Sequence, residues 1–465
     1  MSYYKQLGNL ATKSNQIERD NYEYFNVKDG LRNRDGSGVL VGLTNVSSVI
    51  GYEKVDEELL PLEGRLFYRG IDVADLVNSL EKEERYGYEE TAFLLLFGRL
   101  PSTEETTHFN EVIGKMRNLP LNFSRDVLQT FRTPDITNAL ARSVLTFYGM
   151  DKKPDDLSLP NQIRQGMSLI AKMNTLVPYA YHSIRHGFFN KSLIIHTPDT
   201  NLSAAQNFLR LMRNNMEYTE EEARTLDILL LLHADHGGGN NSTFTTRVVS
   251  STNTDTYSAI AASLGSLKGP LHGGANVRAL KMMEYIIESV GKTPTDDELR
   301  ALLFQILKGE VYDKAGKIYG IGHAVYTLSD PRTRILKKYA EKMAILKNRQ
   351  EEFQIFKQVE ELAPQVLKDF KNNPDFVASA NVDFYSGFIF SCLEIPTEVY
   401  TPMFAMARIA GWCAHRIEVM TNRVKIMRPA YKALKPRQLQ YVPLAERKPV
   451  MEAKQVTKTK SGKCH

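Results

Sequence analysis

Cysteine is scarce in this chain of 465 residues. The three cysteines are Cys392, Cys413 and Cys464. An odd and sparse set does not indicate a disulfide framework, and it favours a reducing compartment. A chain of this length buries a large core without disulfides or a structural metal. The sequence therefore predicts a cytoplasmic location.

Long apolar runs are missing as well. The apolar run at residues 228–232 is far shorter than the roughly 20 residues that a membrane-spanning helix requires. The first residues contain no charged segment followed by an apolar core, so we expect no secretory signal. No membrane partner is predicted.

A strong excess of one charge is also missing. Lys and Arg number 59, and Asp and Glu number 54, which leaves a net charge of +5. Residues 435–465 hold eight basic and two acidic residues, so this tail carries +6 and the rest of the chain −1. Nucleic-acid binding through the tail is one alternative, and it predicts salt-sensitive affinity that truncation after Leu434 removes. The neutral body predicts no nucleic-acid partner.

The composition is that of a folded protein. Hydrophobic residues make up 42% of the chain and charged residues 24%, which excludes disorder for most of it. Residues 39–43 and 65–70 are short β-like runs that we expect to pair. Beyond about residue 74 the apolar spacing predicts helices over residues 89–97, 162–181, 220–232, 296–308 and 334–363, with another after residue 255. The prediction is a mainly α fold with a small N-terminal β element.

Three helix starts have recognisable caps. Thr219 followed by Glu222 has the pattern of a capping box. Asp255 and Thr295 are predicted N-caps of the helices that follow them. At the other end, Gly98 follows residues 89–97 and is predicted to end that helix.

Histidines next to glycines are the main chemical signal. They occur in residues 233–243, 268–276 and 320–325, and a carboxylate flanked by apolar residues, Asp383, lies in residues 381–387. Each has a structural alternative, because a histidine at a helix end is usually a hydrogen-bonded structural residue and Asp383 could cap a helix. Together they are the components of an acid–base site.

Two other kinds of site are not favoured. His233 and His236 are spaced to share a metal, but no cysteine pair or His-Glu-x-x-His pattern supplies further ligands. The glycine-rich segments match neither a phosphate-binding loop nor a dinucleotide fingerprint. No metal and no permanently bound cofactor are predicted.

The sequence resembles the citrate synthase family from about residue 62 to residue 428. Two segments are especially specific: Gly-Pro-Leu-His-Gly-Gly-Ala-Asn at residues 269–276 and Asn-Val-Asp-Phe-Tyr-Ser-Gly at residues 381–387. The other segments that carry the resemblance are residues 64–71, 92–101, 233–243, 320–332 and 404–411.

The resemblance implies three catalytic residues. Asp383 would remove a proton from the methyl carbon of an acyl-CoA, and His272 would hydrogen-bond the thioester oxygen. His323 would polarise the ketone of oxaloacetate. A weak carbon acid needs such a positioned base, together with donors directed at the developing oxyanion.

The resemblance also implies residues that bind the two substrates. Those matching oxaloacetate-binding positions are His236, Asn240, Arg332, Arg408 and Arg428. Those matching CoA-binding positions are Gly320, Ile321, Gly322, Asn381 and Lys317. An arginine fork bonds a carboxylate bidentately, although surface ion pairs are the commoner fate of arginine. The family donates the arginine at position 428 from the neighbouring subunit, which implies a homodimer.

The chain departs from the family pattern in places. Thr327 stands where many members have Lys or Arg near a CoA phosphate, and residues 378–380 are Ala-Ser-Ala where others are basic. Lys314, Lys317 or Arg334 could supply the missing charge. Gly237 replaces an acidic residue that often follows the histidine.

By resemblance, the fold is a mainly α, two-domain citrate synthase-like fold. The large domain would comprise residues 1–275 with 391–465, and a small domain, residues 276–390, would close over the site and exclude water. The implied enzyme is an acyltransferase that makes citrate and CoA from acetyl-CoA, oxaloacetate and water, through citryl-CoA, in the tricarboxylic acid cycle. One alternative is a 2-methylcitrate synthase, since one methylene in the acyl pocket is worth only about 1–3 kcal/mol. Another is a catalytically silent member that acts as a scaffold.

Overall fold

The computed structural model describes residues 3–33, 35–55, 58–434 and 440–447. The chain divides into two compact units, one of residues 1–39 with 428–465 and one of residues 40–427. The first unit contains helices α1 (Tyr3–Asn15) and α2 (Arg19–Tyr24) and short 3-10 turns at Asp29–Leu31 and Leu444–Glu446. Of the eight basic residues of the C-terminal tail, all except Arg447 lie outside the described residues, and so does Cys464.

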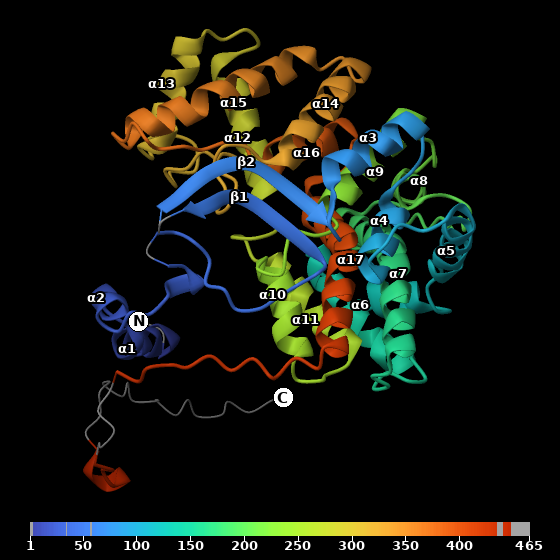
Figure 1. The fold of residues 1–465 in the computed structure, drawn as a ribbon, viewed down its shortest axis with the longest axis horizontal. Coiled ribbons are helices and arrows are strands. Elements are labelled where there is room, and N and C mark those ends of the chain that lie inside the picture. Colours follow the sequence, from blue (N-terminus) through green and yellow to red (C-terminus); the bar gives the residue numbers. More distant parts are fainter. Residues whose placement is uncertain (1–2, 34, 56–57, 435–439, 448–465) are drawn as a thin grey trace, which may run out of the picture. The chain divides into compact units, whose positions relative to one another are not determined.

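A three-stranded antiparallel sheet opens the second unit (Figure 1). Its strands are β1 (Ser47–Val55), β2 (Glu58–Tyr68) and β3 (Ile71–Asp72). β1 and β2 pair from Ser47 opposite Tyr68 to Val55 opposite Glu58, with a register shift between Ile50 and Tyr52. The predicted strand at 65–70 is therefore largely right, but the one at 39–43 is wrong. β2 pairs instead with the adjoining β1, because a short connection costs less loop entropy than a long one.

The rest of this unit is helical, which confirms the mainly α prediction. Its helices are α3 (Val73–Glu83), α4 (Tyr88–Phe97), α5 (Thr103–Met116), α6 (Ile136–Met150), α7 (Leu159–Phe189), α8 (Ala204–Met212), α9 (Glu220–His233), α10 (Asn241–Ser250), α11 (Thr256–Lys268), α12 (Ala275–Val290), α13 (Asp296–Leu307), α14 (Pro331–Leu346), α15 (Gln350–Phe370), α16 (Val382–Cys392) and α17 (Tyr400–Thr421). None of the helices in the described ranges is long and apolar enough to cross a membrane.

The predicted caps are confirmed. Thr219 and Glu222 form a reciprocal capping box at the start of α9, and Thr295 with Glu298 does the same for α13. The Asp255 side chain accepts the backbone N–H of Ser258 at the start of α11. These side chains satisfy N–H groups that have no partner inside the helix.

Two helix predictions need correction. The single helix expected over residues 334–363 is two helices, α14 and α15, separated at residues 347–349. Asn348 has a φ of 55° there, a left-handed conformation that asparagine tolerates better than most residues. The helix expected over residues 162–181 extends from Leu159 to Phe189 and contains Pro178.

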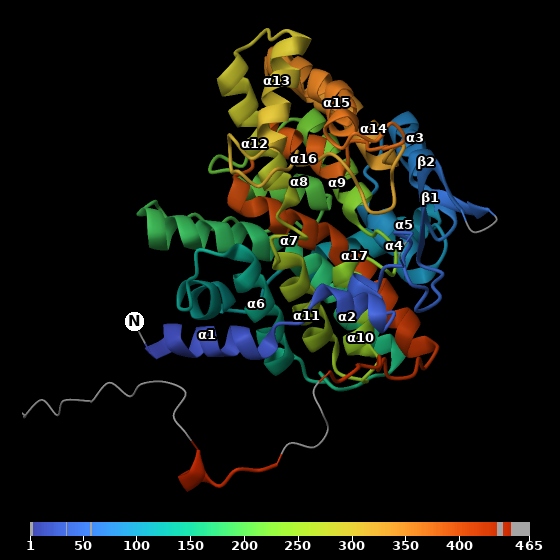
Figure 2. The same cartoon turned by 90° about the vertical axis from the view of Figure 1, so that its left-hand side faces the viewer.

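α17 is the central helix of the larger unit (Figures 1 and 2). Nearly all of its side chains are buried, and it packs against α4, α7, α9, α10 and α11. α12 to α16 pack mainly against one another. Cys392 at the end of α16 and Cys413 in α17 are buried free thiols.

Candidate active site

The loop after α9 carries the first group of predicted residues. The buried His233 ends the helix and donates from Nδ1 to the carbonyl of Leu229 at 2.6 Å. Burial lowers the pKa of His233 to about 3, so its ring is neutral. Further along the same loop, after His236, come the three glycines 237–239. Asn240 follows them and precedes α10, and its Oδ1 accepts a hydrogen bond from the Ser242 hydroxyl at 2.9 Å.

His236 has a ring nitrogen available for a ligand. Its Nε2 is buried and has no hydrogen-bond partner in the described part of the chain. The ring meets those of His323 and Tyr326 edge-on, with centroids 5.3 and 5.4 Å away. Burial and the charge of Arg332 hold the pKa of His236 well below its usual range. A buried polar atom without a partner is costly, and a bound ligand would satisfy it.

His323 is fixed in one tautomer by the backbone. Its Nδ1 accepts the N–H groups of Val325 and Tyr326, both at 3.0 Å. The ring proton therefore belongs on Nε2, which makes that nitrogen a donor. The ring also stacks on Tyr326, with centroids 4.8 Å apart.

His272 lies in the turn between α11 and α12. Its Nε2 is 3.1 Å from the hydroxyl oxygen of Ser242, which also accepts the indole N–H of Trp412 at 3.2 Å. Burial, followed by the charge of Arg408, lowers the pKa of His272 to about 4. The imidazole is therefore neutral at neutral pH.

Asp383 lies in the first turn of α16. Asn381 caps this helix by accepting the Asp383 N–H at 3.0 Å, so Asp383 itself is not the cap. Burial raises the pKa of the Asp383 carboxyl to about 6, although the charges of Arg332 and Arg408 oppose the rise. This carboxylate is a stronger base than an exposed aspartate and remains ionised at neutral pH.

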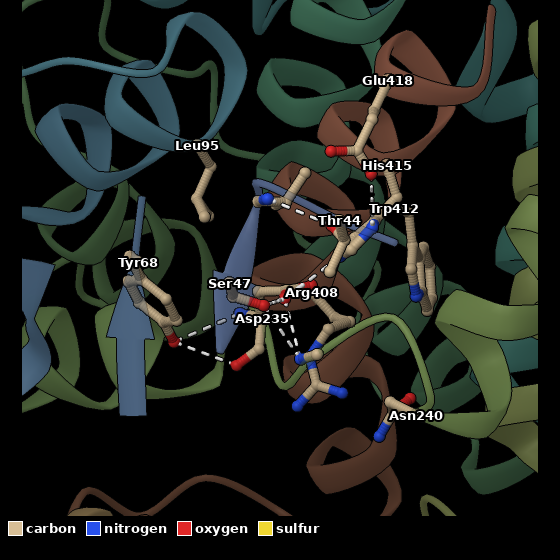
Figure 3. Close-up of polar contacts among 12 residues, drawn as sticks. Thr44, Ser47, Tyr68, Leu95, Asp235, Asn240, Arg408, Trp412, His415 and Glu418 are labelled. Carbon is tan, nitrogen blue, oxygen red and sulfur yellow. Dashed lines mark hydrogen bonds and ion pairs between the residues drawn. The ribbon is translucent and has the colours of Figure 1, made fainter. Parts of the chain in front are cut away.

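Two buried arginines share this environment. Arg332 pairs bidentately with the buried Asp330, through Nε at 3.0 Å and Nη2 at 2.7 Å. Arg408 donates from Nε to the carbonyl of His233 at 2.7 Å, and its guanidinium end points away from the contacts around Asp235 in Figure 3.

The charges of these arginines connect the predicted residues. Arg408 influences the pKa values of His236, His272 and Asp383. Arg332 influences those of His236 and Asp383. The structure therefore gathers these five side chains, from segments far apart in the sequence, into one electrostatic environment.

The residues expected to bind CoA also come together, apart from Lys317. Ile321 forms an isolated antiparallel bridge with Ala380, and the Asn381 N–H donates to the carbonyl of Gly320 at 2.9 Å. The Asn381 side chain donates to the carbonyl of Gly322 at 2.8 Å. Lys317 is exposed in the loop that leads to this pair of segments.

The candidates for a phosphate contact are less well placed. The hydroxyl of Thr327 is buried without a partner in the described part of the chain. Arg334 is paired with Glu63 of β2, and Lys314 is exposed. Arg428 belongs to the other compact unit, residues 1–39 with 428–465.

A buried polar network beside the site went unnoticed in the sequence (Figure 3). One carboxylate oxygen of Asp235 accepts from the Ser47 hydroxyl, from the Gly237 N–H at 3.0 Å and from His415 Nε2 at 3.3 Å. The other ring nitrogen of His415 accepts from Arg247 at 3.0 Å. Burial disfavours the charged carboxylate of Asp235, but His415 and Ser47 together hold its pKa below the usual value.

The network ends at α10 and α17. Arg247 pairs with Glu418 at 2.6 Å, and Glu418 accepts the backbone N–H of Asn45, also at 2.6 Å. His415 and Glu418 are polar residues in the mostly apolar helix α17, and this is the signal that could have revealed them, because a buried charge requires a partner. Arg247 lies among other polar residues in α10 and has no such signal.

No group of three His, Cys, Asp or Glu side chains within the described ranges is arranged to hold a metal ion. His233 and His236 in particular have separate surroundings: the first ring meets Phe404 and the second meets His323 and Tyr326.

Known proteins match the chain over most of its length. The family model "Citrate synthase, C-terminal domain" matches residues 35–430. The citrate synthase of Synechocystis sp. is 34% identical over 430 residues, which cover 90% of this chain and 94% of that relative. The 2-methylcitrate synthase of Shewanella oneidensis is 30% identical over 384 residues, which cover 82% and 92%. A solved ternary complex of the Thermoplasma acidophilum citrate synthase with carboxymethyl coenzyme A and oxaloacetate has a TM-score of 0.73 at 25% identity, and the match covers 90% of this chain and 99% of that one.

Proposed function

The chain belongs to the citrate synthase family, and from this we propose that it condenses acetyl-CoA with oxaloacetate and hydrolyses the resulting citryl-CoA to citrate and CoA. One observation carries the proposal for the site. The Asp383 carboxyl, whose pKa is raised to about 6, is exposed to the charges of two buried arginines, Arg332 and Arg408. The charge of Arg408 also acts on the neutral imidazoles of His236 and His272. Such a site can remove a proton from carbon while it binds a dianion.

Asp383 acts as the base. It takes a proton from the methyl carbon of acetyl-CoA, and the pair of electrons left behind forms the enol or enolate that attacks oxaloacetate. Its raised pKa supports this role, because a general base takes up a proton more readily when its pKa lies closer to the working pH.

His272 donates a hydrogen bond to the thioester oxygen. The Ser242 hydroxyl has a single proton, which it can give either to Asn240 or to His272 Nε2. In the second arrangement the ring proton of His272 resides on Nδ1, where it can stabilise the developing oxyanion.

His323 polarises the ketone of oxaloacetate. The two backbone N–H groups at its Nδ1 support a ring proton on Nε2 and hence a donor of fixed direction. His236, Asn240, Arg332 and Arg408 bind the rest of oxaloacetate. The unpartnered Nε2 of His236 and the closeness of both arginine charges support this assignment.

CoA lies along the paired segments at Gly320, Ile321, Gly322 and Asn381, with Lys317 near its phosphates. Residues 276–390 form the small domain that closes over the site, as the mutual packing of α12 to α16 supports. A homodimer places Arg428 in the neighbouring subunit's site. We also place the protein in the cytoplasm, which the buried free thiols of Cys392 and Cys413 support.

The second candidate is a 2-methylcitrate synthase that uses propionyl-CoA through the same residues. The match to the Shewanella oneidensis enzyme supports it. Comparing kcat/KM for acetyl-CoA and propionyl-CoA on the purified protein tests both proposals. A higher value for acetyl-CoA supports the first and a higher value for propionyl-CoA the second. No CoA release from either would contradict both and leave a silent scaffold.

A further inference from the structure

The base of the β1–β2 hairpin holds the loop that carries His236. The Ser47 hydroxyl donates to Asp235 and also accepts the Gly237 N–H at 3.0 Å. On β2, opposite Ser47, the Tyr68 hydroxyl lies 3.1 Å from the Asp235 carbonyl and accepts the Asp235 N–H at 3.2 Å. Both neighbours of His236 are thus fixed by this one pair of strands.

The middle of the same hairpin packs on the segment that carries His323 and Arg332. A Cβ atom added at Gly51 of β1 would fall less than 3.0 Å from the carbonyl of Val325. One added at Gly64 of β2 would fall equally close to the carbonyl of Ser329. Neither glycine has a positive φ. These two positions therefore require glycine because a larger side chain would not fit, and not because of the backbone conformation.

Hydrogen bonds reinforce this second contact. The Gly64 N–H donates to the Ser329 hydroxyl at 3.2 Å, and the Tyr326 hydroxyl donates to the Arg65 carbonyl at 3.3 Å. Tyr326 is the residue whose ring stacks on His323 and contacts His236. The hairpin therefore holds the aromatic ring that contacts both imidazoles.

We propose that the β1–β2 hairpin is a positioning element that sets the spacing between the His236 loop and the segment with His323 and Arg332. This deepens the proposed function and rests on it, because the two segments carry the groups assigned to oxaloacetate. Ser47, Gly51 and Gly64 are its positioning residues, because they act through the two segments that they contact.

Gly64→Ala and Gly51→Ala test this proposal. Alanine suits a strand better than glycine does, so the substitution harms only the close contact with residues 325–329. We expect KM for oxaloacetate to rise at least about tenfold, since misplacing groups by about 1 Å can cost about 100-fold in rate. KM for acetyl-CoA should change less than about twofold.

Gly42→Ala is the matched control. Nothing lies within 4 Å of a Cβ atom added there, and Gly42 has no positive φ. Ser47→Ala removes only the hydroxyl that contacts the loop of His236. This variant tests the positioning role even if a glycine variant does not fold. It should also raise KM for oxaloacetate selectively, whereas Gly42→Ala should leave it unchanged.

Turnover of the unsubstituted protein is measured first, and calorimetry then follows oxaloacetate binding in each variant. An inactive parent protein that binds no oxaloacetate would contradict the proposed function. An active parent whose hairpin variants lose thermal stability but keep KM for oxaloacetate would overturn the positioning role, because that is the result of a purely structural contact. A selective rise in KM supports it.

Discussion

Asp383 is half-buried at the start of α16, where burial makes its ionised form less favourable than in water. Replacing it by alanine should lower kcat by about 100-fold to 10,000-fold, because a positioned general base contributes that much. Oxaloacetate binding should stay nearly intact. The rate of CoA release measures kcat, and calorimetric titration measures the affinity for oxaloacetate. Asp375→Asn, at a nearby exposed aspartate, is the control and should retain full activity. Near-normal turnover of Asp383→Ala would contradict the assignment.

The pH profile should report the same carboxyl. Since the base must be ionised, kcat/KM should rise with pH, be half-maximal near pH 6 and level off above it. His233 and His272 have pKa values of about 3 and 4, so they do not titrate in this range. The residual activity of Asp383→Ala should lack this transition. A parent profile that is flat between pH 5 and pH 7.5 would exclude Asp383 as the titrating base.

Asp383 should also lower the stability of the fold. A pKa raised above the unfolded value of 3.8 means that the folded protein binds this proton more tightly, so stability falls as pH rises from about 4 to about 6. Asp383→Asn should therefore raise Tm at pH 7.5 and change it little near pH 4. Scanning calorimetry at both pH values measures the difference. An equal change at the two values would mean that the carboxyl charge is not the cause.

Single residues were predictable where several chemical signals lay close together in the sequence. The glycine-flanked histidines and Asp383 stood out, and the charge of Arg408 acts on His236, His272 and Asp383 alike. Asp235 and His415 could not be paired in advance, because their contact joins segments 180 residues apart. A polar residue in a mostly apolar helix, such as His415 in α17, does not indicate which distant group will satisfy it.

At the scale of elements, the capping box of α9 should contribute measurably to stability. Thr219→Ala removes the hydroxyl that accepts the Glu222 N–H. We expect the free energy of unfolding to fall by about 1 kcal/mol. Denaturant unfolding measures the change. Thr107→Ala, in the exposed middle of α5, is the matched control because its hydroxyl bonds only within its own helix. An equal loss in both variants would rule out the cap as the source.

Helices were predicted better than strand pairing for a physical reason. Caps and apolar spacing act over three or four residues, so Thr219, Asp255 and Thr295 mark helix starts from local sequence alone. Strand pairing depends on which segments meet, and residues 39–43 have the composition of a strand without being one. The break at Asn348 was missed because the charged pattern continues through it.

At the scale of the whole molecule, mixed dimers test the role of Arg428. If this arginine serves the neighbouring subunit, Asp383→Ala and Arg428→Ala should each form homodimers with little activity. Co-expressed, they should give heterodimers with one intact site, formed by Asp383 of one subunit and Arg428 of the other. Activity of the purified heterodimer is the measurement. Continued inactivity, with each homodimer correctly assembled, would show that Arg428 does not act across subunits.

The mainly α architecture followed from the sequence because helical spacing recurs along most of the chain. The proposed division at residues 276–390 came from family resemblance alone. Helix spacing states which face of a helix is buried but not which helices move together, so that boundary has no local signature in the chain.

The burial of α17 has a consequence for hydrogen exchange. Its backbone amides lie inside the core, so they can exchange with solvent only when the larger unit unfolds as a whole. Because Arg408 is part of this helix, the segment that carries it in the proposed oxaloacetate site should be among the slowest to take up deuterium. Oxaloacetate should slow its exchange further, as a ligand that binds only the folded protein must. The side of the proposed site that α17 forms should therefore stay folded during turnover, and the proposed closure would have to move the segments that face α17.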